Sequence, residues 1–289
     1  MVYYKDEVIY SDNNLMLING DCMDFMERMA DAEVRVDTII TSPFYNTNAK
    51  AKGTSRRTNQ NVQCKEYHYI RYDYHVDNLT SEEYARFSQS LFEHYDKILS
   101  HNGVVLYNLS FGSEVPNDWI MALNAIVTQT NFTLADVLIW KKKTAFPNSS
   151  SSNKTTRICE FIFVLCRKSE ILTFKSNKKS TSRRDTGQKA FENIYNFIEA
   201  KNNDGPCPYN KATYSSELVE QLIDRYVLDG SIVFDSFCGS GTTLVACYNK
   251  GLKGLGCEIS LNQCNFAKDR ILKQIGDTDG NSKVTPEVS

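Results

Sequence analysis

A strand, a glycine turn and a helix follow one another without interruption in the C-terminal third of this chain. The apolar run Ile232-Val233-Phe234 leads into Asp235 and then into Gly239-Ser240-Gly241, and helical spacing begins at Thr242. Such a junction presents backbone N–H groups and the positive end of a helix to a ligand. Glycine lets the backbone approach that ligand without a Cβ clash. The chain is therefore predicted to fold as an α/β protein that binds a small polar cofactor at this turn.

Two common nucleotide-binding loops do not fit the turn. A dinucleotide fingerprint needs glycine or alanine three residues after Gly241, where this chain has Leu244. A P-loop needs Gly-Lys followed by Ser or Thr, which is absent here. Glu258 follows Asp235 at roughly the twenty-residue spacing at which an acid reaches a ribose hydroxyl in doubly wound sheets. The turn thus fits a nucleoside-type cofactor, and its expected binding residues are Asp235, Phe237, Gly239, Ser240, Gly241, Thr242, Thr243 and Glu258.

A second chemical segment lies far upstream. The run Val36-Asp37-Thr38-Ile39-Ile40 predicts a buried strand that ends at Thr41-Ser42-Pro43-Phe44-Tyr45. An exocyclic amino nitrogen of adenine or cytosine is a poor nucleophile, because its lone pair is delocalised into the ring. Two acceptors that take its N–H bonds make it more pyramidal and direct the lone pair at a methyl donor. Ser42 Oγ and the Pro43 carbonyl can supply these acceptors, and Tyr45 can stack on a flipped base.

Thr-Ser-Pro alone is typical of an ordinary turn, so the interpretation depends on its combination with the glycine turn. Together the two segments predict methyl transfer from S-adenosylmethionine to DNA, with Ser42, Pro43 and Tyr45 as the catalytic residues. An RNA or protein methyltransferase on the same sheet, and a non-catalytic DNA-binding module, remain alternatives. A dehydrogenase is disfavoured by Leu244.

Strands and helices alternate along most of the chain. Helical spacing is expected over residues 81–99, 119–129, 216–227, 242–250 and 262–275, and strands over 36–40, 103–109, 132–140, 161–166, 231–234 and 254–259. Alternation of this kind predicts a doubly wound, mostly parallel, Rossmann-like sheet with right-handed crossovers. The polar residues 276–289 are expected to form a disordered tail.

Residues 141–205 differ from the rest in being rich in serine and strongly basic, with 14 lysines and arginines against 6 acids. We interpret them as a target-recognition insertion, or a set of loops on one face, between a catalytic half (1–140) and a cofactor-binding half (206–275). Basic side chains neutralise phosphates, and arginine also reads guanine edges. The expected DNA contacts are Lys50, Lys52, Arg56 and Arg57 in a loop after the catalytic segment, and Arg157, Lys178, Lys179, Arg183 and Arg184.

These motifs resemble those of the amino-directed DNA methyltransferases, in the group whose catalytic motif precedes the cofactor motif. The resemblance covers most of residues 15–272. Asn19-Gly20-Asp21-Cys22 resembles the family's Gly-Asp, whose acid binds the cofactor adenine, which implies Asp21. The segment 210–215 resembles the family's His-Pro-Ala-Pro-Phe-Pro, which helps to hold the methionine part, and implies Lys211. Ser42-Pro43-Phe44-Tyr45 and Asp235 to Thr243 resemble its catalytic and glycine motifs.

Some positions depart from the family pattern. Phe44 and Ser236 stand where the family has prolines, which leaves a weak or inactive enzyme open. In the family, serine at the first acceptor position accompanies cytosine N4 more often, and aspartate accompanies adenine N6. Ser42 therefore favours cytosine N4, with adenine N6 as the alternative.

The remaining expectations concern the environment of the protein. No apolar run reaches the roughly 18 residues that cross a bilayer, and residues 1–10 lack signal-peptide character. The nine cysteines form no Cys-x-x-Cys pair, which favours free thiols in a reducing cytoplasm and no metal site. Double-stranded DNA is the expected partner. A cognate restriction endonuclease is a further candidate, and both monomer and homodimer are open.

Overall fold

A single large mixed sheet organises the protein. The computed structural model describes residues 7–46, 79–112, 115–145, 147, 152–183, 187, 189–210 and 212–281. Within them the sheet has the strand order β1-β2-β11-β10-β3-β4-β6-β5-β9. Its strands are β1 (Val8–Ser11), β2 (Leu15–Asn19), β3 (Val36–Thr41), β4 (Leu99–Leu109), β5 (Phe132–Lys142), β6 (Cys159–Arg167), β9 (Phe197–Ala200), β10 (Ile232–Asp235) and β11 (Lys253–Glu258).

The pairing confirms the expected mostly parallel α/β fold. Strands β2, β11, β10, β3 and β4 run parallel to one another, and β9 is parallel to β5. Two strands run the other way: β1 at the edge, and β6, which is antiparallel to both β4 and β5. The first residues of β6 therefore lie at the edge of the sheet where its neighbours have their carboxyl ends. The sequence pattern predicted β6 as a strand but not its direction.

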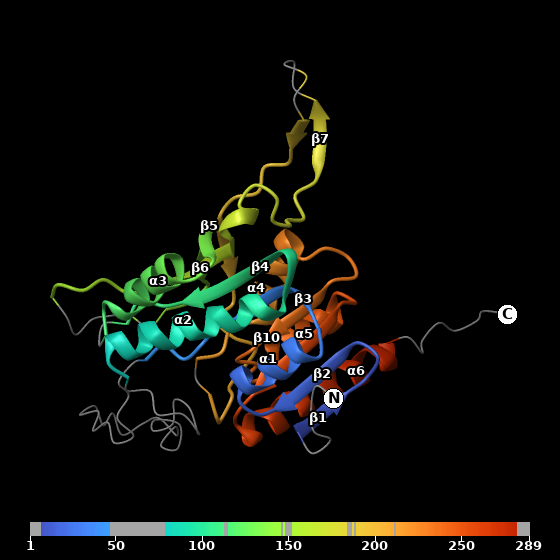
Figure 1. Ribbon diagram of the computed structural model, residues 1–289. Helices are drawn as coiled ribbons and strands as arrows, with labels where there is room; N and C mark the ends of the chain where they lie inside the picture. The colour runs from blue at the N-terminus through green and yellow to red at the C-terminus, as the bar shows by residue number, and fades with distance from the viewer. Residues whose placement is uncertain are drawn as a thin grey trace.

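Helices cover both faces of the sheet, as expected for a doubly wound fold (Figure 1). One face packs against α1 (Cys22–Asp31), α2 (Ser81–Ile98) and α3 (Asp118–Gln129), and the other against α4 (Ser216–Tyr226), α5 (Thr242–Asn249) and α6 (Leu261–Asn281). Alternation along each strand divides the two cores: in β4, Val104 and Leu106 face α4–α6, whereas Val105 and Tyr107 face α1–α3.

Local signals fix the start of α2. The Thr80 hydroxyl accepts a hydrogen bond from the Glu83 backbone N–H at 3.2 Å, and the Glu83 carboxylate accepts one from the Thr80 N–H at 2.8 Å. This reciprocal capping box satisfies two N–H groups that the first turn would otherwise leave unpaired. The helix consequently begins at Ser81, where the sequence predicted it.

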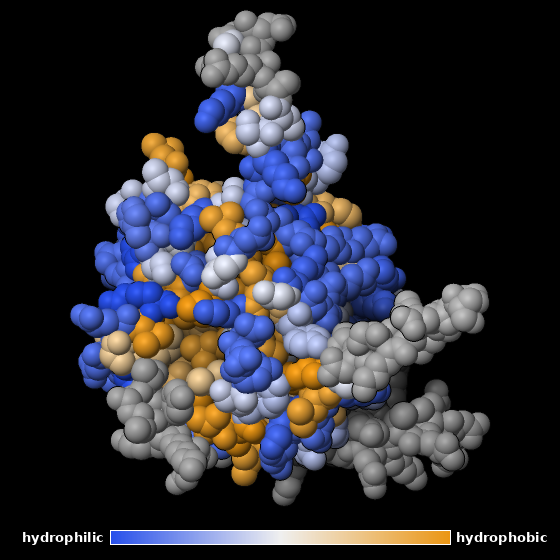
Figure 2. Space-filling model, turned by 90° about the vertical axis from the view of Figure 1, so that its right-hand side faces the viewer, coloured by the Kyte–Doolittle hydropathy of each residue, from blue (hydrophilic) through white to orange (hydrophobic). Residues whose placement is uncertain are grey.

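The basic region 141–205 is divided between the sheet and a projecting hairpin. Strand β6 lies between β4 and β5, and β9 forms an edge of the same sheet. A short helix, η2 (Lys168–Glu170), follows β6, and a two-stranded hairpin of β7 (Ser180–Arg183) and β8 (Lys189–Phe191) comes next. Figures 1 and 2 show this hairpin standing away from the body of the protein. The part of the region that projects from the sheet is therefore this hairpin.

Parts of the structure near the two ends of the chain differ from the sequence expectation. Strands β1 and β2 and helix α1 form a unit before β3 that periodicity did not predict, since both strands are very short. Helix α6 continues to Asn281, past the expected start of the tail at residue 276, and residues 282–289 lie outside the described range. Within the described ranges, no helix is both long and apolar enough to span a bilayer.

Candidate active site

A cavity of about 260 Å³ opens where the carboxyl ends of β2, β3, β10 and β11 meet. Each strand is followed by residues that line it: Gly20 and Asp21 after β2, Ser42 after β3, Phe237 after β10, and Glu258 at the end of β11. The other lining residues are Cys22, Met23, Phe44, Phe87, Asn210, Ser236, Ile259 and Gln263. Of the residues predicted from sequence, the cavity brings together Asp21, Ser42, Phe237 and Glu258.

The two acids of this cavity are held in different ways. Asp21 is exposed and caps α1, with its carboxylate accepting a hydrogen bond from the Met23 N–H at 2.7 Å. Glu258 is nearly buried, and its two oxygens accept from the N–H groups of Gly239 at 2.8 Å and Ser260 at 2.9 Å. The Glu258 carboxylate thus fixes the glycine turn against the end of β11 as well as lining the cavity.

The glycines of the turn serve close packing. Gly239 and Gly241 have φ angles of +52° and +79°, in the left-handed region that side chains disfavour. A Cβ on Gly241 would lie 2.7 Å from the Cβ of Ala267 in α6. A Cβ on Gly239 would lie 3.3 Å from the Asn210 side-chain amide. These two glycines therefore allow α6 and the segment around residue 210 to close on the turn.

Asp235 lies beneath the cavity and does not line it. Its carboxylate is fully buried and accepts hydrogen bonds from the hydroxyls of Thr41 at 2.8 Å, Tyr214 at 3.0 Å and Thr243 at 2.5 Å, and from the Phe237 N–H at 3.1 Å. Burial raises the pKa of Asp235, while these hydrogen bonds oppose the rise. Asp235 therefore joins the end of β3 to the glycine turn and to the segment around Tyr214.

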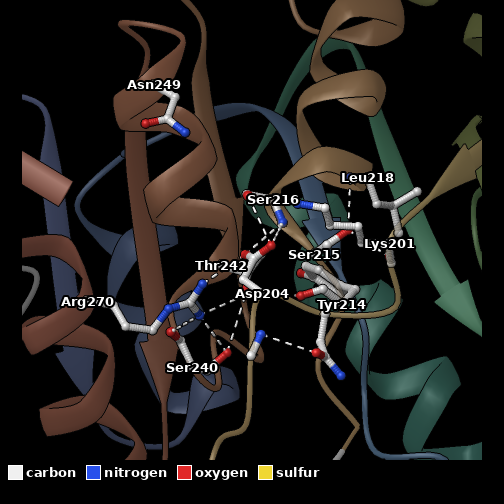
Figure 3. Close-up of polar contacts among 12 residues, drawn as sticks. Lys201, Asp204, Tyr214, Ser215, Ser216, Leu218, Ser240, Thr242, Asn249 and Arg270 are labelled. Carbon is white, nitrogen blue, oxygen red and sulfur yellow. Dashed lines mark hydrogen bonds and ion pairs between the residues drawn. The ribbon is translucent and has the colours of Figure 1, made fainter. Parts of the chain in front are cut away.

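Ser240, Gly241, Thr242 and Thr243 also lie outside the cavity lining. Figure 3 shows why for two of them: the Arg270 guanidinium from α6 donates to the Ser240 carbonyl at 2.7 Å and to the Thr242 hydroxyl at 3.1 Å. The second terminal nitrogen of Arg270, Nη2, donates to Asp204 at 2.9 Å. Asp204 also accepts from the Ser216 N–H at the start of α4. Arg270 has no sequence signal of its own, because its partners come from distant segments.

The segment that follows β3 also carries a polar network. The hydroxyls of Ser42 and Tyr45 are 2.7 Å apart, and the Tyr45 hydroxyl lies 2.8 Å from Asn108 Oδ1 and 3.3 Å from Glu160 Oε2. The Lys142 ammonium forms an ion pair with the other oxygen of Glu160. Sequence reasoning did not identify Asn108, Glu160 or Lys142 as site residues, since strand register alone brings them to Tyr45.

Both departures from the family pattern have local compensation. The backbone carbonyl of Phe44 accepts a hydrogen bond from the Tyr84 hydroxyl at 2.7 Å, and its buried ring packs against those of Tyr84 and Phe87. The Ser236 hydroxyl is 2.5 Å from the Tyr95 hydroxyl and 3.3 Å from that of Thr41. Tertiary contacts therefore fix the backbone at the two positions where the family has prolines. Pro43, between Ser42 and Phe44, is buried.

The predicted DNA contacts lie in two places. The Arg157 guanidinium donates to the Phe111 carbonyl at 2.6 Å and lies over the Phe111 ring, beyond the end of β4. Lys178 and Lys179 are exposed just before β7, and Arg183 ends that strand. The other predicted residues lie outside the described ranges: Lys50, Lys52, Arg56, Arg57, Arg184 and the cofactor-binding candidate Lys211. Over the described residues, no group of three or more His, Cys, Asp or Glu side chains could hold a metal ion.

Known proteins are similar to this chain in sequence and in fold. A type II methyltransferase, M.MjaII of Methanocaldococcus jannaschii, is 36% identical over 84 residues, which are 29% of this chain and only 16% of that protein. The orphan methyltransferase M.BamHII of Bacillus amyloliquefaciens is 25% identical over 212 residues, covering 62% of this chain and 78% of that protein. The structure of the cytosine-N4-specific PvuII DNA methyltransferase matches with a TM-score of 0.65 at 14% identity, over 99% of this chain and 92% of that one.

The match to that structure concerns the fold, and a family model identifies the family. A family model for N6 and N4 DNA methylases matches residues 36–269, which include both the Ser42 segment and the glycine turn. The chain belongs to the N6/N4 DNA methylase family.

Proposed function

We propose that this protein transfers a methyl group from S-adenosylmethionine to the exocyclic amino nitrogen of a base flipped out of duplex DNA. The observation that carries the proposal is the shared cavity: Ser42 lies in one pocket with Asp21, Phe237 and Glu258. The Thr41–Asp235 hydrogen bond links the segment that supplies Ser42 to the one that supplies Phe237. The target we favour is cytosine N4, with adenine N6 as the alternative.

The cavity suits the cofactor chemically. Carboxylates at Asp21 and Glu258 can accept from an adenine amino group and from ribose hydroxyls, and the Phe237 ring gives an apolar wall. Asn210, and the neighbouring Lys211, are assigned to the methionine end. When bound, S-adenosylmethionine supplies an electrophilic methyl group on a sulfonium. The roles of Asp235, Ser240, Gly241, Thr242 and Thr243 are then to shape the pocket from beneath.

The catalytic residues orient the acceptor base. Ser42 Oγ and the Pro43 carbonyl take the two N–H bonds of the amino group, so that its lone pair faces the cavity. The Tyr45 ring stacks on the flipped base, while its hydroxyl is anchored by Asn108. Serine at this position and the fold shared with a cytosine-N4-specific enzyme support cytosine as the target.

The DNA-binding surface is assigned to basic residues at the catalytic edge and on the hairpin. Arg157 stands shortly before Glu160 in the chain and contacts Phe111. Lys178, Lys179 and Arg183 belong to the β7–β8 region, which projects from the body of the protein in Figure 2. A hairpin of this size fits the major groove, where arginine and lysine can contact bases and phosphates. Lys50, Lys52, Arg56 and Arg57, which lie outside the described ranges, are proposed as further DNA contacts. A cognate endonuclease and a homodimer are further proposals.

The test uses the full chain with labelled S-adenosylmethionine and duplex DNA. Wild-type protein is expected to label DNA, and Ser42→Ala and Tyr45→Ala together are expected to abolish labelling while leaving cofactor binding by calorimetry intact. Full activity in that double variant would remove Ser42 and Tyr45 from the mechanism. Competition with RNA decides the acceptor polymer, and nucleotide-resolution mapping of modified bases decides between cytosine and adenine.

A further inference from the structure

A chain of hydrogen-bonding groups runs from the catalytic serine to a nearly buried acid. Ser42 Oγ lies 2.7 Å from the Tyr45 hydroxyl, and that hydroxyl lies 3.3 Å from Glu160 Oε2. Asn108 Oδ1 lies 2.8 Å from the Tyr45 hydroxyl and 3.4 Å from the Ser42 hydroxyl, so it is an alternative acceptor for either hydrogen. Asn108 holds the two hydroxyls together, but its amide oxygen is a very weak base. Glu160 is the member of this network that can take up a proton.

Strand register explains how an acid reaches this place. Glu160 is near the start of β6 and pairs with Trp140 of β5. Because β6 is antiparallel to β4 and β5, its start lies at the edge of the sheet where those two strands end. Asn108 of β4 pairs with Ile162, two residues further along β6, so Asn108 and Glu160 share one face of the sheet. Lys142 lies two residues beyond Trp140 on the same face and reaches Glu160 diagonally.

Burial makes the placement of this carboxylate costly. The Glu160 side chain is 10% exposed, and its charged partner Lys142 is 25% exposed. A charge withdrawn from water to this extent needs both pairing and hydrogen bonds. Lys142 pairs with Oε1, while Oε2 is left to face Tyr45. An ion pair that only joined β5 to β6 would not need to direct its second oxygen at the catalytic segment.

We propose that Glu160, acting through Tyr45, polarises Ser42 and is the final acceptor of the proton that the target amino group loses. The proposal rests on the assigned role of Ser42. Positive charge develops on the amino nitrogen as its lone pair forms the new N–C bond and the methyl–sulfur bond breaks, its electron pair staying on sulfur. A carboxylate at the end of the hydroxyl chain stabilises that charge through Ser42 Oγ.

The proton then has a balanced route. The amino nitrogen gives up its surplus proton to Ser42 Oγ as the Ser42 hydrogen passes to Tyr45, and the Tyr45 hydrogen passes to Glu160 Oε2. The products of this step are a neutral methylamino group and a carboxylic acid at Glu160, while Ser42 and Tyr45 are again neutral hydroxyls. Glu160 returns its proton to water through its exposed edge. Glu160 is therefore a positioning and proton-accepting residue, and Tyr45 connects it to the base.

The test compares two isosteric variants and their combination. Glu160→Gln removes the charge, and Tyr45→Phe removes the hydroxyl but keeps the ring for stacking. Each is expected to lower the single-turnover rate of methyl transfer about 100-fold or more. Because both act through one chain, the double variant is expected to be no slower than Tyr45→Phe alone. Glu160→Asp, which keeps the charge on a shorter side chain, is expected to recover part of the rate.

The chain offers a matched control in Glu199. It forms a similar ion pair with Lys141 between β5 and β9, but the two side chains are more exposed, at 46% for Glu199 and 39% for Lys141. Glu199→Gln is expected to keep the wild-type rate. Readouts independent of turnover are the Tm, the Kd for duplex DNA and the fluorescence of 2-aminopurine at the target base. The Kd and the fluorescence are expected to match wild type in Glu160→Gln. The Tm is expected to fall, because Lys142 loses the charge that it pairs with. A purely structural role for the ion pair would lower the Tm without slowing methyl transfer.

The outcomes distinguish failure of the proton path from failure of the role assigned to Ser42. A wild-type rate in Tyr45→Phe or Glu160→Gln, or multiplicative losses in the double variant, would overturn the proton path. If Ser42→Ala is inactive in the same assay, the assigned catalytic serine survives that result. If Ser42→Ala is fully active, both the path and the assigned site fall together. Tyr45→Phe alone suffices for the decision should Glu160→Gln fail to fold.

Discussion

Gly241 provides the sharpest test of how the glycine turn is built. It precedes α5 with φ of +79°, and a Cβ there would lie 2.7 Å from the Cβ of Ala267. Gly251 follows the same helix with φ of +65°, and a Cβ there would meet nothing within 4 Å. The two positions therefore share the backbone strain but differ in the steric clash.

The difference has a calculable size. A non-glycine residue in the left-handed region costs about 1–2 kcal/mol, and forcing an extra methyl into a packed contact costs about 1–3 kcal/mol more. Gly251→Ala should thus lose about 1–2 kcal/mol of unfolding free energy, and Gly241→Ala about 2–5 kcal/mol. At about 2–4 °C per kcal/mol for a chain of this class, the Tm of Gly241→Ala should fall clearly below that of Gly251→Ala.

Urea denaturation and thermal unfolding of both variants measure this difference. The combination Gly241→Ala with Ala267→Gly removes the nearest clashing atom and is expected to lose less than the sum of the two single changes. Equal destabilisation of Gly241→Ala and Gly251→Ala would refute the reasoning, since it would leave backbone strain as the whole effect. Such a result would also mean that α6 does not pack closely on the turn.

Three further predictions concern polar side chains. Thr41→Val removes a donor to the buried Asp235 carboxylate and should lower the unfolding free energy by about 1–3 kcal/mol in urea titration. Arg270→Met should raise the cofactor Kd in calorimetry. Arg270→Lys should restore it incompletely, because one ammonium nitrogen cannot occupy both positions from which the two guanidinium nitrogens reach Ser240 and Asp204. Burial raises the pKa of Tyr10 and of Tyr226 from 10.0 to about 12. Their folded-state pKa values exceed the unfolded value, so their contribution to stability is complete below pH 10 and is lost as the pH rises to about 12. Tyr226→Phe should flatten that alkaline decline, as followed by circular dichroism.

The elements that could be predicted have strong local signals. Strand β3 is a β-branched run that ends at a proline-containing loop, and the glycine turn follows shortly after β10. Helix α2 has both helical spacing and a capping box at Thr80. For such segments the periodicity of apolar residues and the chemistry of the ends agree, so the fold class followed from the sequence.

The parts that could not be predicted depend on tertiary geometry. The direction of β6 is not encoded in its apolar pattern, because a buried strand has the same composition in either direction. Asn108 and Glu160 come together through register alone. Sequence spacing placed Asp235, Thr242 and Thr243 near the cofactor turn. It could not tell whether their side chains would line the cavity or form buried hydrogen bonds beneath it. In the structure their side chains form hydrogen bonds beneath the cavity and do not line it.

The reversed direction of β6 has one more consequence. Its chain enters the sheet from the segment that contains Arg157, and Glu160 follows within the same short stretch. A residue assigned to the duplex and the acid beside Tyr45 are therefore joined by a few peptide units, with no intervening helix or long loop. Anchoring of Arg157 on a phosphate would restrict the backbone freedom of Glu160. Binding of the duplex at Arg157 would thereby fix the position of Glu160 beside Tyr45.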